Sequence, residues 1–510
     1  MAFEERIAQH AELRARARSM GGSKKLERRK EHGLLNARER IDYLLDPDTF
    51  EESGLFTRSV LPEAQDETPT DGKIAGFGKI DRRRVGIVAN DFTVKGASST
   101  ALNGKKMGHI RQVATTNGFP MVYLGESSGA RMPDIMGARG MAATLEHNMY
   151  LRKRETPWAN AILGNAFGSS AWYACMSDFN VMTKGSCMAV SSARLVSLAT
   201  RGQVDPEDLG GWKLLSEETG IADLVTDTDE QALDAIKRFL SYLPSNHNEA
   251  PPRAEVPEGS DEPVKEILDL IPEERTRVYD STKVIQRIVD IDSLFELKAR
   301  FGRTMVTALA RIDGRTVGIL ASNPLHKGGA IDASACEKVC SFIVLCDSFN
   351  IPMVFLIDQP GFMIGVEAER RKIVGKIINW MNAMALATVP KIALQLRKNY
   401  GQAWLNMGGG KNADEFAAWW LGETGFMDPS SAVGVVFGID REAEPERYGE
   451  LLEEMVRDTS AYESASVYGI KDVIDPRETR DYLKSMLDVH DLGMTGGVGQ
   501  HLMQAWPTTF

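Results

Sequence analysis

The stretch KIDRRRVGIVAND (79–91) returns later in the chain as RIDGRTVGILASN (311–323). Isoleucine, aspartate, arginine, valine and glycine recur in the same order, and Ile312 lies 232 residues after Ile80 (312 − 80 = 232). Similarity of a chain to itself at a fixed spacing marks a repeated structural unit. This pair therefore predicts that the chain of 510 residues consists of two homologous halves.

Two further pairs of stretches support the repeat. FPMVYLGESSGARM (119–132) matches IPMVFLIDQPGFMIG (351–365), again at an offset of 232 between Pro120 and Pro352 (352 − 120 = 232). TPWANAILGNAFGSSAW (156–172) matches VPKIALQLRKNYGQAW (389–404) at an offset of 233, one residue more (401 − 168 = 233). We assign residues 1–245 to a first domain, 265–510 to a second, and the proline-rich and charged segment 246–264 to a linker.

Each half alternates short strands with helices. The run PMVYLG (120–125) is apolar and bounded by turns, which favours a strand, and the segment before it, 103–118, is expected to be a helix. Strands that alternate with helices indicate βαβ units and the α/β class. Helical periodicity also runs through residues 23–47, where the Lys/Arg run is expected to form a solvated face.

Composition excludes several classes of function. The net charge of −11 (60 Lys+Arg against 71 Asp+Glu) argues against nucleic-acid binding. Five cysteines without a C-x-x-C pair indicate reduced thiols and a cytoplasmic protein. Eight scattered histidines give no metal-ligand spacing, so no metal is expected. The charged N-terminus is not a signal peptide, and no apolar run is long enough for a membrane helix.

The stretch GESSG (125–129) matches the G-x-S-x-G nucleophile elbow of serine hydrolases, with Ser127 as the candidate nucleophile. The second half holds Gln359 and Pro360 at the two serine positions, whereas Gly129 is kept as Gly361. The two halves thus share a tight turn and not a hydroxyl group. We interpret the turn as structural or as a source of backbone N–H groups, and the hydrolase remains a less favoured alternative.

Several motifs together resemble one family. GLLNARERIDYLLDPDTFEE (33–52), NDFTVKGAS (90–98), ESSGARM (126–132), DPEDLGG (205–211) and ATVPKIALQLRKNYGQAW (387–404) are similar to the carboxyltransferase (beta) subunit of biotin-dependent acyl-CoA carboxylases, propionyl-CoA carboxylase beta-like. The resemblance implies a duplicated crotonase-like fold, the ββα superhelix of the ClpP/crotonase class, in two homologous halves. It also implies a homohexamer, an acyl-CoA substrate on the first half, and biotin on a partner's carrier domain, charged by a biotin carboxylase, on the second.

The same resemblance assigns site residues. Its thioester oxyanion hole falls at Gly168 and Ser169, and its biotin oxyanion hole at Gln402 and Ala403. AFGSSAWY (166–173) and YGQAWLNM (400–407) depart from the family by placing serine and glutamine where glycine is usual. The resemblance further implies residues that bind acyl-CoA: Gly129, Ala130, Arg131, Lys105, Lys106 and Leu405. Among these, the basic residues are proposed for the CoA phosphates and Leu405 for the acyl pocket. It also implies residues that bind biotin: Gly361, Phe362, Gly401 and Trp404.

The implied chemistry suits a duplicated fold. Carboxyl transfer to the α-carbon of a thioester passes through an enolate, and released biotin carries similar charge on its ureido oxygen. Each anionic oxygen needs preorganised donors such as backbone N–H groups, so two similar oxyanion holes are expected. A decarboxylase subunit that runs the same reaction backwards and a non-catalytic scaffold of a carboxylase complex stay open as alternatives.

Overall fold

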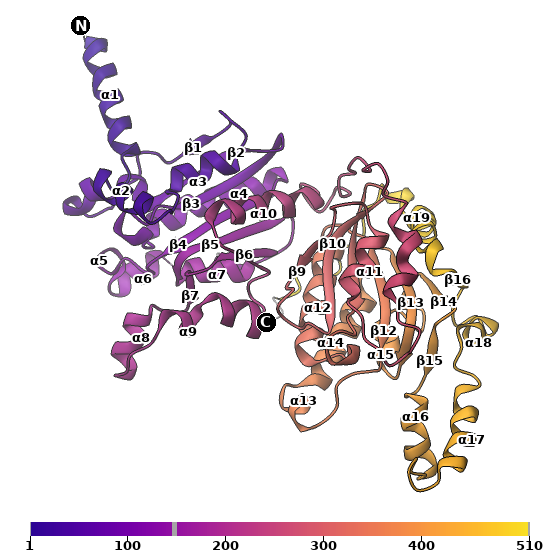
Figure 1. Ribbon diagram of the computed structural model, residues 1–510. Helices are drawn as coiled ribbons and strands as arrows, with labels where there is room; N and C mark the ends of the chain where they lie inside the picture. The colour runs from indigo at the N-terminus through magenta and orange to yellow at the C-terminus, as the bar shows by residue number, and fades with distance from the viewer. Residues whose placement is uncertain (1, 145–149, 508–510) are drawn as a thin grey trace. The chain divides into compact units, whose positions relative to one another are not determined.

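The two repeated stretches both form a strand at the end of a β-hairpin. The computed structural model describes residues 2–144 and 150–507, which divide into two units. The first unit contains the chain up to Ser241 together with Ser245–His247, and the second contains Tyr242–Pro244 and the chain from Asn248 onward. Each unit is built around one sheet (Figure 1).

The sheet of the first unit has the strand order β1-β2-β3-β4-β5-β6-β8. The first three strands are antiparallel, the following pairs are parallel, and β7 pairs with the end of β5. The strands are β1 (Glu51–Ser53), β2 (Lys73–Ile80), β3 (Arg83–Asn90), β4 (Met121–Ser127), β5 (Trp158–Phe167), β6 (Phe179–Thr183), β7 (Cys187–Ala189) and β8 (Leu224–Thr226).

The second sheet repeats this topology strand for strand, in the order β9-β10-β11-β12-β13-β14-β16, with β15 paired to β13. Even the irregularity between β4 and β5, at Gly125 and Ser127, recurs between β12 and β13 at Ile357 and Gln359. The strands are β9 (Phe295–Leu297), β10 (Met305–Ile312), β11 (Arg315–Ser322), β12 (Met353–Gln359), β13 (Lys391–Tyr400), β14 (Glu415–Trp419), β15 (Glu423–Gly425) and β16 (Asp472–Ile474). The expected α/β duplication is confirmed.

The helix expected within 23–47 is broken into two. Helix α2 ends at Glu31, and α3 begins at Ala37 behind a capping box in which Asn36 and Glu39 satisfy each other's backbone N–H groups. No residue of α2 is buried, as expected for a solvated face, yet Arg29 reaches the carboxylate of Glu126 at 2.9 Å. The helices of this unit are α1 (Ala2–Arg18), α2 (Ser23–Glu31), α3 (Ala37–Leu44), α4 (Ala101–Asn117), α5 (Met132–Ile135), α6 (Ala138–Thr144), α7 (Ser169–Met176), α8 (Ala193–Thr200), α9 (Pro206–Gly210) and α10 (Asp229–Tyr242).

In the second unit, α12 follows β11 as α4 follows β3, and α15 follows β13 as α7 follows β5. The helices are α11 (Ser281–Ile288), α12 (Ala333–Ser348), α13 (Val366–Arg370), α14 (Ile373–Leu386), α15 (Ala403–Asn406), α16 (Pro429–Ala432), α17 (Pro445–Val456), α18 (Ala461–Ser466) and α19 (Thr479–Val489). Figure 1 shows α8 extending away from the first sheet beyond β7, and α16 and α17 extending away from the second beyond β15.

Most of the segment assigned to a linker, from Asn248 onward, belongs to the second unit, whereas residues 246 and 247 belong to the first. Ala254 donates its N–H to the carbonyl of Gly314 at 2.8 Å, and a Cβ atom at Gly314 would lie 2.2 Å from the carbonyl oxygen of Ala254. Glycine at this hairpin turn therefore lets the segment lie directly on the backbone.

Each unit has its own apolar core. A cluster of the second unit lies around Val306, Ile319, Leu394 and Trp419. In the first unit the core includes Ile110 and Met121. Among the described residues, no helix is long and apolar enough to cross a membrane, and no group of three or more His, Cys, Asp or Glu side chains is arranged to hold a metal ion.

Candidate functional site

The turn after β4 lies directly against the N-terminus of α7. Gly129 in the turn has φ 100° and Gly168 before the helix has φ 63°, both in the region that favours glycine. A Cβ atom at Gly168 would lie 3.7 Å from the Cα atom of Gly129. The structure thus brings together two glycines that the sequence separates by 39 positions (168 − 129 = 39).

Ser99 fastens the two sides of this site. Its N–H donates to the carbonyl of Gly129 at 2.8 Å, and its carbonyl accepts from the N–H of Arg131 at 2.9 Å, so that Ala130 is held in an isolated β-bridge and stays exposed. The hydroxyl groups of Ser99 and Ser169 lie 2.8 Å apart. The unusual serine of α7 is therefore tied to the strand-end turn.

The second unit repeats this geometry. Ile331 donates to the carbonyl of Gly361 at 3.0 Å and accepts from Met363 at 2.8 Å, which makes an equivalent bridge at Phe362. Gly361 has φ 122° and Gly401 has φ 67°, and a Cβ atom at Gly361 would lie 3.8 Å from the carbonyl oxygen of Tyr400. The turn after β12 therefore meets the start of α15 as the turn after β4 meets the start of α7.

Serine and glutamine fit where the family usually has glycine. The positive φ angles belong to Gly168 and Gly401, whereas Gln402 is helical at φ −59° and ψ −27°, and Ser169 is the first residue of α7. A side chain at either position therefore imposes no backbone strain. The exposed Gln402 amide donates to the sulfur of Met381 at 3.7 Å.

The chemistry available at both places is donation from backbone N–H groups. The first N–H groups of a helix have no acceptor within it and carry partial positive charge. At Gly168–Ser169 and at Gln402–Ala403, such groups lie beside a turn that glycine leaves without a side chain. The two units thus present a matched pair of helix starts, each beside a glycine turn.

Ser127 is not placed as a nucleophile. It is completely buried, donates its hydroxyl to the carbonyl of Ala97 at 3.1 Å, and accepts from the N–H of Gly129 at 3.1 Å. In the second unit the buried Gln359 amide donates to Asn399 at 2.7 Å. Ser127 therefore supports the turn at Gly129, and Gln359 ties the end of β12 to the end of β13.

The acidic residue that precedes Ser127 or Gln359 anchors the turn to the rest of its unit. Glu126 is buried and ion-paired with Arg40 at 2.7 Å as well as with Arg29. Asp358, at the equivalent position, pairs with Arg397 at 2.8 Å. Such pairs fix the strand ends because removing one partner leaves a buried charge uncompensated.

Two of the residues expected to meet CoA phosphates are occupied elsewhere. Arg131 is buried, pairs with Asp71, and donates from Nε to the hydroxyl of Ser98 at 3.2 Å. Lys106 is buried and donates to the carbonyl of Lys73 at 2.5 Å. Lys338, its counterpart in the second unit, donates to the carbonyl of Met305 at 2.8 Å, so this lysine belongs to the duplicated fold. Burial lowers the pKa of both Lys106 and Lys338 to about 8.

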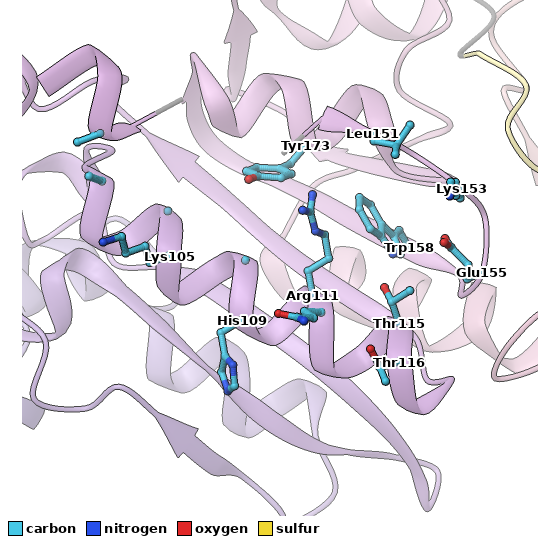
Figure 2. A pocket seen from close by; sticks show the side chains of 15 residues that line it. Lys105, His109, Arg111, Thr115, Thr116, Leu151, Lys153, Glu155, Trp158 and Tyr173 are labelled. Atoms are coloured by element: carbon cyan, nitrogen blue, oxygen red, sulfur yellow. The ribbon is translucent and has the colours of Figure 1, made fainter. Parts of the chain in front are cut away.

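Lys105, in contrast, is exposed and lines a pocket of about 660 Å³ along α4. Figure 2 shows Arg111 extending from α4 towards the rings of Tyr173 and Trp158, while Lys153 lies on the facing loop. The pocket has the size usual for small-molecule sites. Sequence reasoning missed its other basic and aromatic residues: Arg111, Lys153, Trp158 and Tyr173.

A signal for this pocket was present in the sequence. Gly104 and Gly108 are four residues apart on α4, so one face of the helix lacks side chains, and a Cβ atom at Gly108 would meet nothing within 4 Å. Arg111 follows on the same face. A glycine pair followed by a basic residue at helical spacing therefore indicates an open, positively charged groove.

The glycine run 408–410 supports the residues that follow the second turn. A Cβ atom at Gly409 would fall 2.3 Å from the ring of Trp404, and one at Gly410 would fall 2.5 Å from Leu405. Trp404 and Leu405 therefore pack on bare backbone. Phe362 lies edge-on to the ring of Trp380, at 6.2 Å between centroids.

Comparison with known proteins gives consistent matches along the chain. A family model described as the carboxyl transferase domain matches residues 28–491. The carboxyltransferase subunit of propionyl-CoA carboxylase from Haloferax mediterranei is 34% identical over 95% of both chains. The alpha subunit of methylmalonyl-CoA decarboxylase from Propionigenium modestum is 30% identical over 90% of this chain and 91% of its own. The transcarboxylase 12S hexamer structure, with methylmalonyl-coenzyme A and methylmalonic acid bound, has a TM-score of 0.89 at 32% identity and covers 96% of each chain.

Proposed function

Since the chain belongs to the carboxyl transferase family, we propose that it transfers a carboxyl group between biotin and the α-carbon of an acyl-CoA thioester. The family resemblance found in the sequence is confirmed, as is the duplicated crotonase-like α/β fold. The observation that carries the proposal further is the matched pair of helix starts, each behind a glycine with positive φ and beside a glycine turn.

In the first unit, the N–H groups at Gly168–Ser169 and of Ala130 donate to the thioester oxygen. The oxygen gains negative charge when the α-proton leaves, so these donors stabilise the enolate more than the substrate. Donors of this kind contribute on the order of 10²–10³ in rate each. The link between Ser99 and Ser169 keeps the two sides at a fixed separation during the reaction.

In the second unit, the N–H groups at Gln402 and Ala403 receive the ureido oxygen of biotin. Carboxybiotin supplies the carboxyl group and, after releasing it, the base that accepts the α-proton. Gly361 and Gly401 suit this ligand because neither carries a Cβ atom to separate it from the backbone. Phe362 and Trp404 lie beside the turn and the helix start, where they form apolar walls.

The acyl-CoA nucleotide is assigned to the pocket along α4, where Lys105, Arg111 and Lys153 supply positive charge for phosphates. The acyl-CoA domain is then 1–245 and the biotin domain 265–510, as the family resemblance implies. We further propose a homohexamer, like the transcarboxylase 12S structure, that works in the cytoplasm with a biotin carboxylase and a biotin carrier subunit.

The test starts from the purified chain. Incubated with methylmalonyl-CoA and free biotin, it should form propionyl-CoA only when biotin is present, as followed by chromatography of the CoA esters. Repeating the assay with carboxylated acyl-CoA esters of other chain lengths ranks the substrates. Propionyl-CoA formation at the same rate without biotin, or none from any ester, would contradict the proposal.

The Gln402 side chain gives a sharper test of the second hole. Restoring the family's glycine with Gln402→Gly should keep or improve the use of free biotin, because the backbone donates and the amide only limits the approach. Loss of biotin-dependent transfer in a folded Gln402→Gly protein would instead identify the side chain as the donor.

A decarboxylase subunit is the second candidate, favoured by the 30% identity to the methylmalonyl-CoA decarboxylase alpha subunit. The two roles differ in what the partner does with the biotin. Supplied with a biotinylated carrier, a biotin carboxylase, ATP and bicarbonate, a carboxylase subunit accumulates carboxylated acyl-CoA. Net carboxylation that stays at background, together with active methylmalonyl-CoA decarboxylation, would favour the decarboxylase.

A further inference from the structure

A small polar cavity lies beneath the first turn of α7, where Ser169 and Ser170 line it. Its volume is about 10 Å³, roughly the lower limit for one water molecule. Polar side chains dominate the lining: Lys73, Asn90, Tyr123, Asn160, Ser169, Ser170 and Tyr173. Strands β2 to β5 and helix α7 all contribute to it.

Two of these side chains lack hydrogen-bond partners among the described residues. Both polar atoms of the Asn160 amide and the hydroxyl of Tyr123 are unpaired, although Asn160 is 1% exposed and Tyr123 4%. A buried polar group without a partner destabilises the folded state. Its presence in a closely packed sheet therefore calls for a function or a bound molecule.

The second unit shows that the fold does not need them. Tyr123 and Asn160 face each other across β4 and β5, and the equivalent pair across β12 and β13 is Phe355 and Ala393. One strand further, Lys73 pairs with Asn90, and the equivalent pair is Met305 and Ser322. Identical topology is thus built with a largely apolar centre in one unit and a polar centre in the other.

The polar atoms point to the start of α7. A Cβ atom at Gly125 would lie 3.1 Å from the hydroxyl of Ser170 and 3.4 Å from the amide oxygen of Asn160. Gly125 therefore leaves room for these two groups to converge above β4. In the second unit the same three positions hold Ile357, Ala403 and Ala393, which are buried and apolar.

We propose that Asn160 is a positioning residue for the thioester hole, and that with Tyr123 it binds one ordered water under α7. The water and the Ser170 hydroxyl connect β4 and β5 to the first helical turn, which holds the Gly168 and Ser169 N–H groups in the direction of the enolate oxygen. Groups that support a site from behind commonly fix its geometry in this way. This inference rests on the proposed carboxyl transfer.

The experiment uses the residues that the second unit already contains. Asn160→Ala and Tyr123→Phe should each leave the melting temperature of the full chain close to that of the wild type, because the second unit builds the same pair of strands with Ala393 and Phe355 at these positions. The kcat of carboxyl transfer should fall at least tenfold with Asn160→Ala while KM for acyl-CoA changes less than threefold. Asn160→Ser, which keeps a hydroxyl for the water, should recover part of the lost kcat.

Thr316→Val is the matched control. Thr316 is 1% exposed, its hydroxyl has no partner among the described residues, and it lies at the start of β11, outside the residues of both glycine turns and both helix starts. Its loss should leave the protein at least as stable, because it removes an unpaired buried group, and kcat should not change. If Asn160→Ala keeps the wild-type kcat, or loses stability and activity together, the positioning role is wrong.

A crystal structure at high resolution separates this inference from the proposed function. It should show a water within hydrogen-bond distance of both Asn160 and Tyr123 in the wild-type protein, and none there in Asn160→Ala. A dry cavity overturns the inference even if the enzyme transfers carboxyl groups. A wild-type protein inactive in every carboxyl-transfer assay overturns the proposed function, and the positioning role with it.

Discussion

Ser127 and Gln359 are both fully buried just before a glycine turn, where Ser127 accepts from the N–H of Gly129 and Gln359 donates to the carbonyl of Tyr400. Ser127→Ala should therefore lower stability by about 1–2 kcal/mol, because the Gly129 N–H loses its acceptor. The kcat should stay within twofold of the wild type. Chemical denaturation and steady-state kinetics check both numbers, and a covalent acyl adduct on Ser127 in the mass spectrum would instead restore the hydrolase.

Gly168 is the single residue on which the first hole depends most directly. A side chain there meets an unfavourable backbone angle, at about 1–3 kcal/mol, and points towards the Gly129 turn. We expect Gly168→Val to lower kcat/KM on the order of 10²-fold or more, which is the loss expected when one backbone donor no longer reaches the oxygen.

Gly259→Ala is the control for that substitution. Gly259 has φ 81° and nothing within 4 Å of a built Cβ atom, so a side chain there meets similar strain outside both glycine turns and both helix starts. Its kcat/KM should equal that of the wild type. Equal losses in both variants would attribute the Gly168 effect to general destabilisation.

At the scale of elements, α4 and α12 each send one lysine to the first carbonyl of a neighbouring strand. Burial lowers the pKa of Lys106 and of Lys338 to about 8, from 10.5 in the unfolded chain. Between these two values the unfolded state binds more protons, so stability rises with pH. Below about pH 8 both states are protonated and this contribution is constant.

Methionine at either position should remove that dependence. The stability of the wild type relative to Lys106→Met, and relative to Lys338→Met, should rise from pH 8 to pH 10 in thermal unfolding. KM for acyl-CoA should not change in Lys106→Met, whereas Lys105→Met should raise it several-fold. A flat pH profile would show that these lysines are better solvated than their burial implies, and a raised KM in Lys106→Met would return Lys106 to the phosphate site.

These elements also show what sequence can predict. The positions of the strands and of the helix starts could be predicted from the repeat at constant spacing. An apolar strand that ends in a glycine turn is expected to fold in the same way in both halves. Arg131 and Lys106 could not be placed, because the carbonyls and the Asp71 carboxylate that occupy them come from distant strands and loops. The break between α2 and α3 could have been predicted from the capping box of Asn36 and Glu39. The helical periodicity continues across this position, however, and favoured one helix.

On the scale of the whole molecule, exposed apolar side chains occur on two extensions that we call arms. One arm is helix α8 beyond β7, and the other is helices α16 and α17 with the residues between them, beyond β15. Leu198 on α8 is 68% exposed, and Val435 after α16 is 71% exposed. Exposed apolar groups of this kind favour association between copies. Light scattering should therefore give a mass several times 56.2 kDa.

Leu198→Glu and Val435→Glu should shift that mass downwards and lower the activity in parallel. The equally exposed Val489→Glu, on α19 and outside both arms, serves as the control and should keep the wild-type mass. An active particle of about 56 kDa would contradict a site that needs more than one subunit.

The chain passes from one unit to the other between Ser241 and Asn248, and each unit buries its own core. We therefore expect that the two units need not be joined in one polypeptide in order to fold. Two genes, one ending at residue 247 and one starting at residue 248, should yield the same active enzyme when they are co-expressed in one cell. Insoluble products from such a split gene would instead show that synthesis as one polypeptide helps the second half to mature.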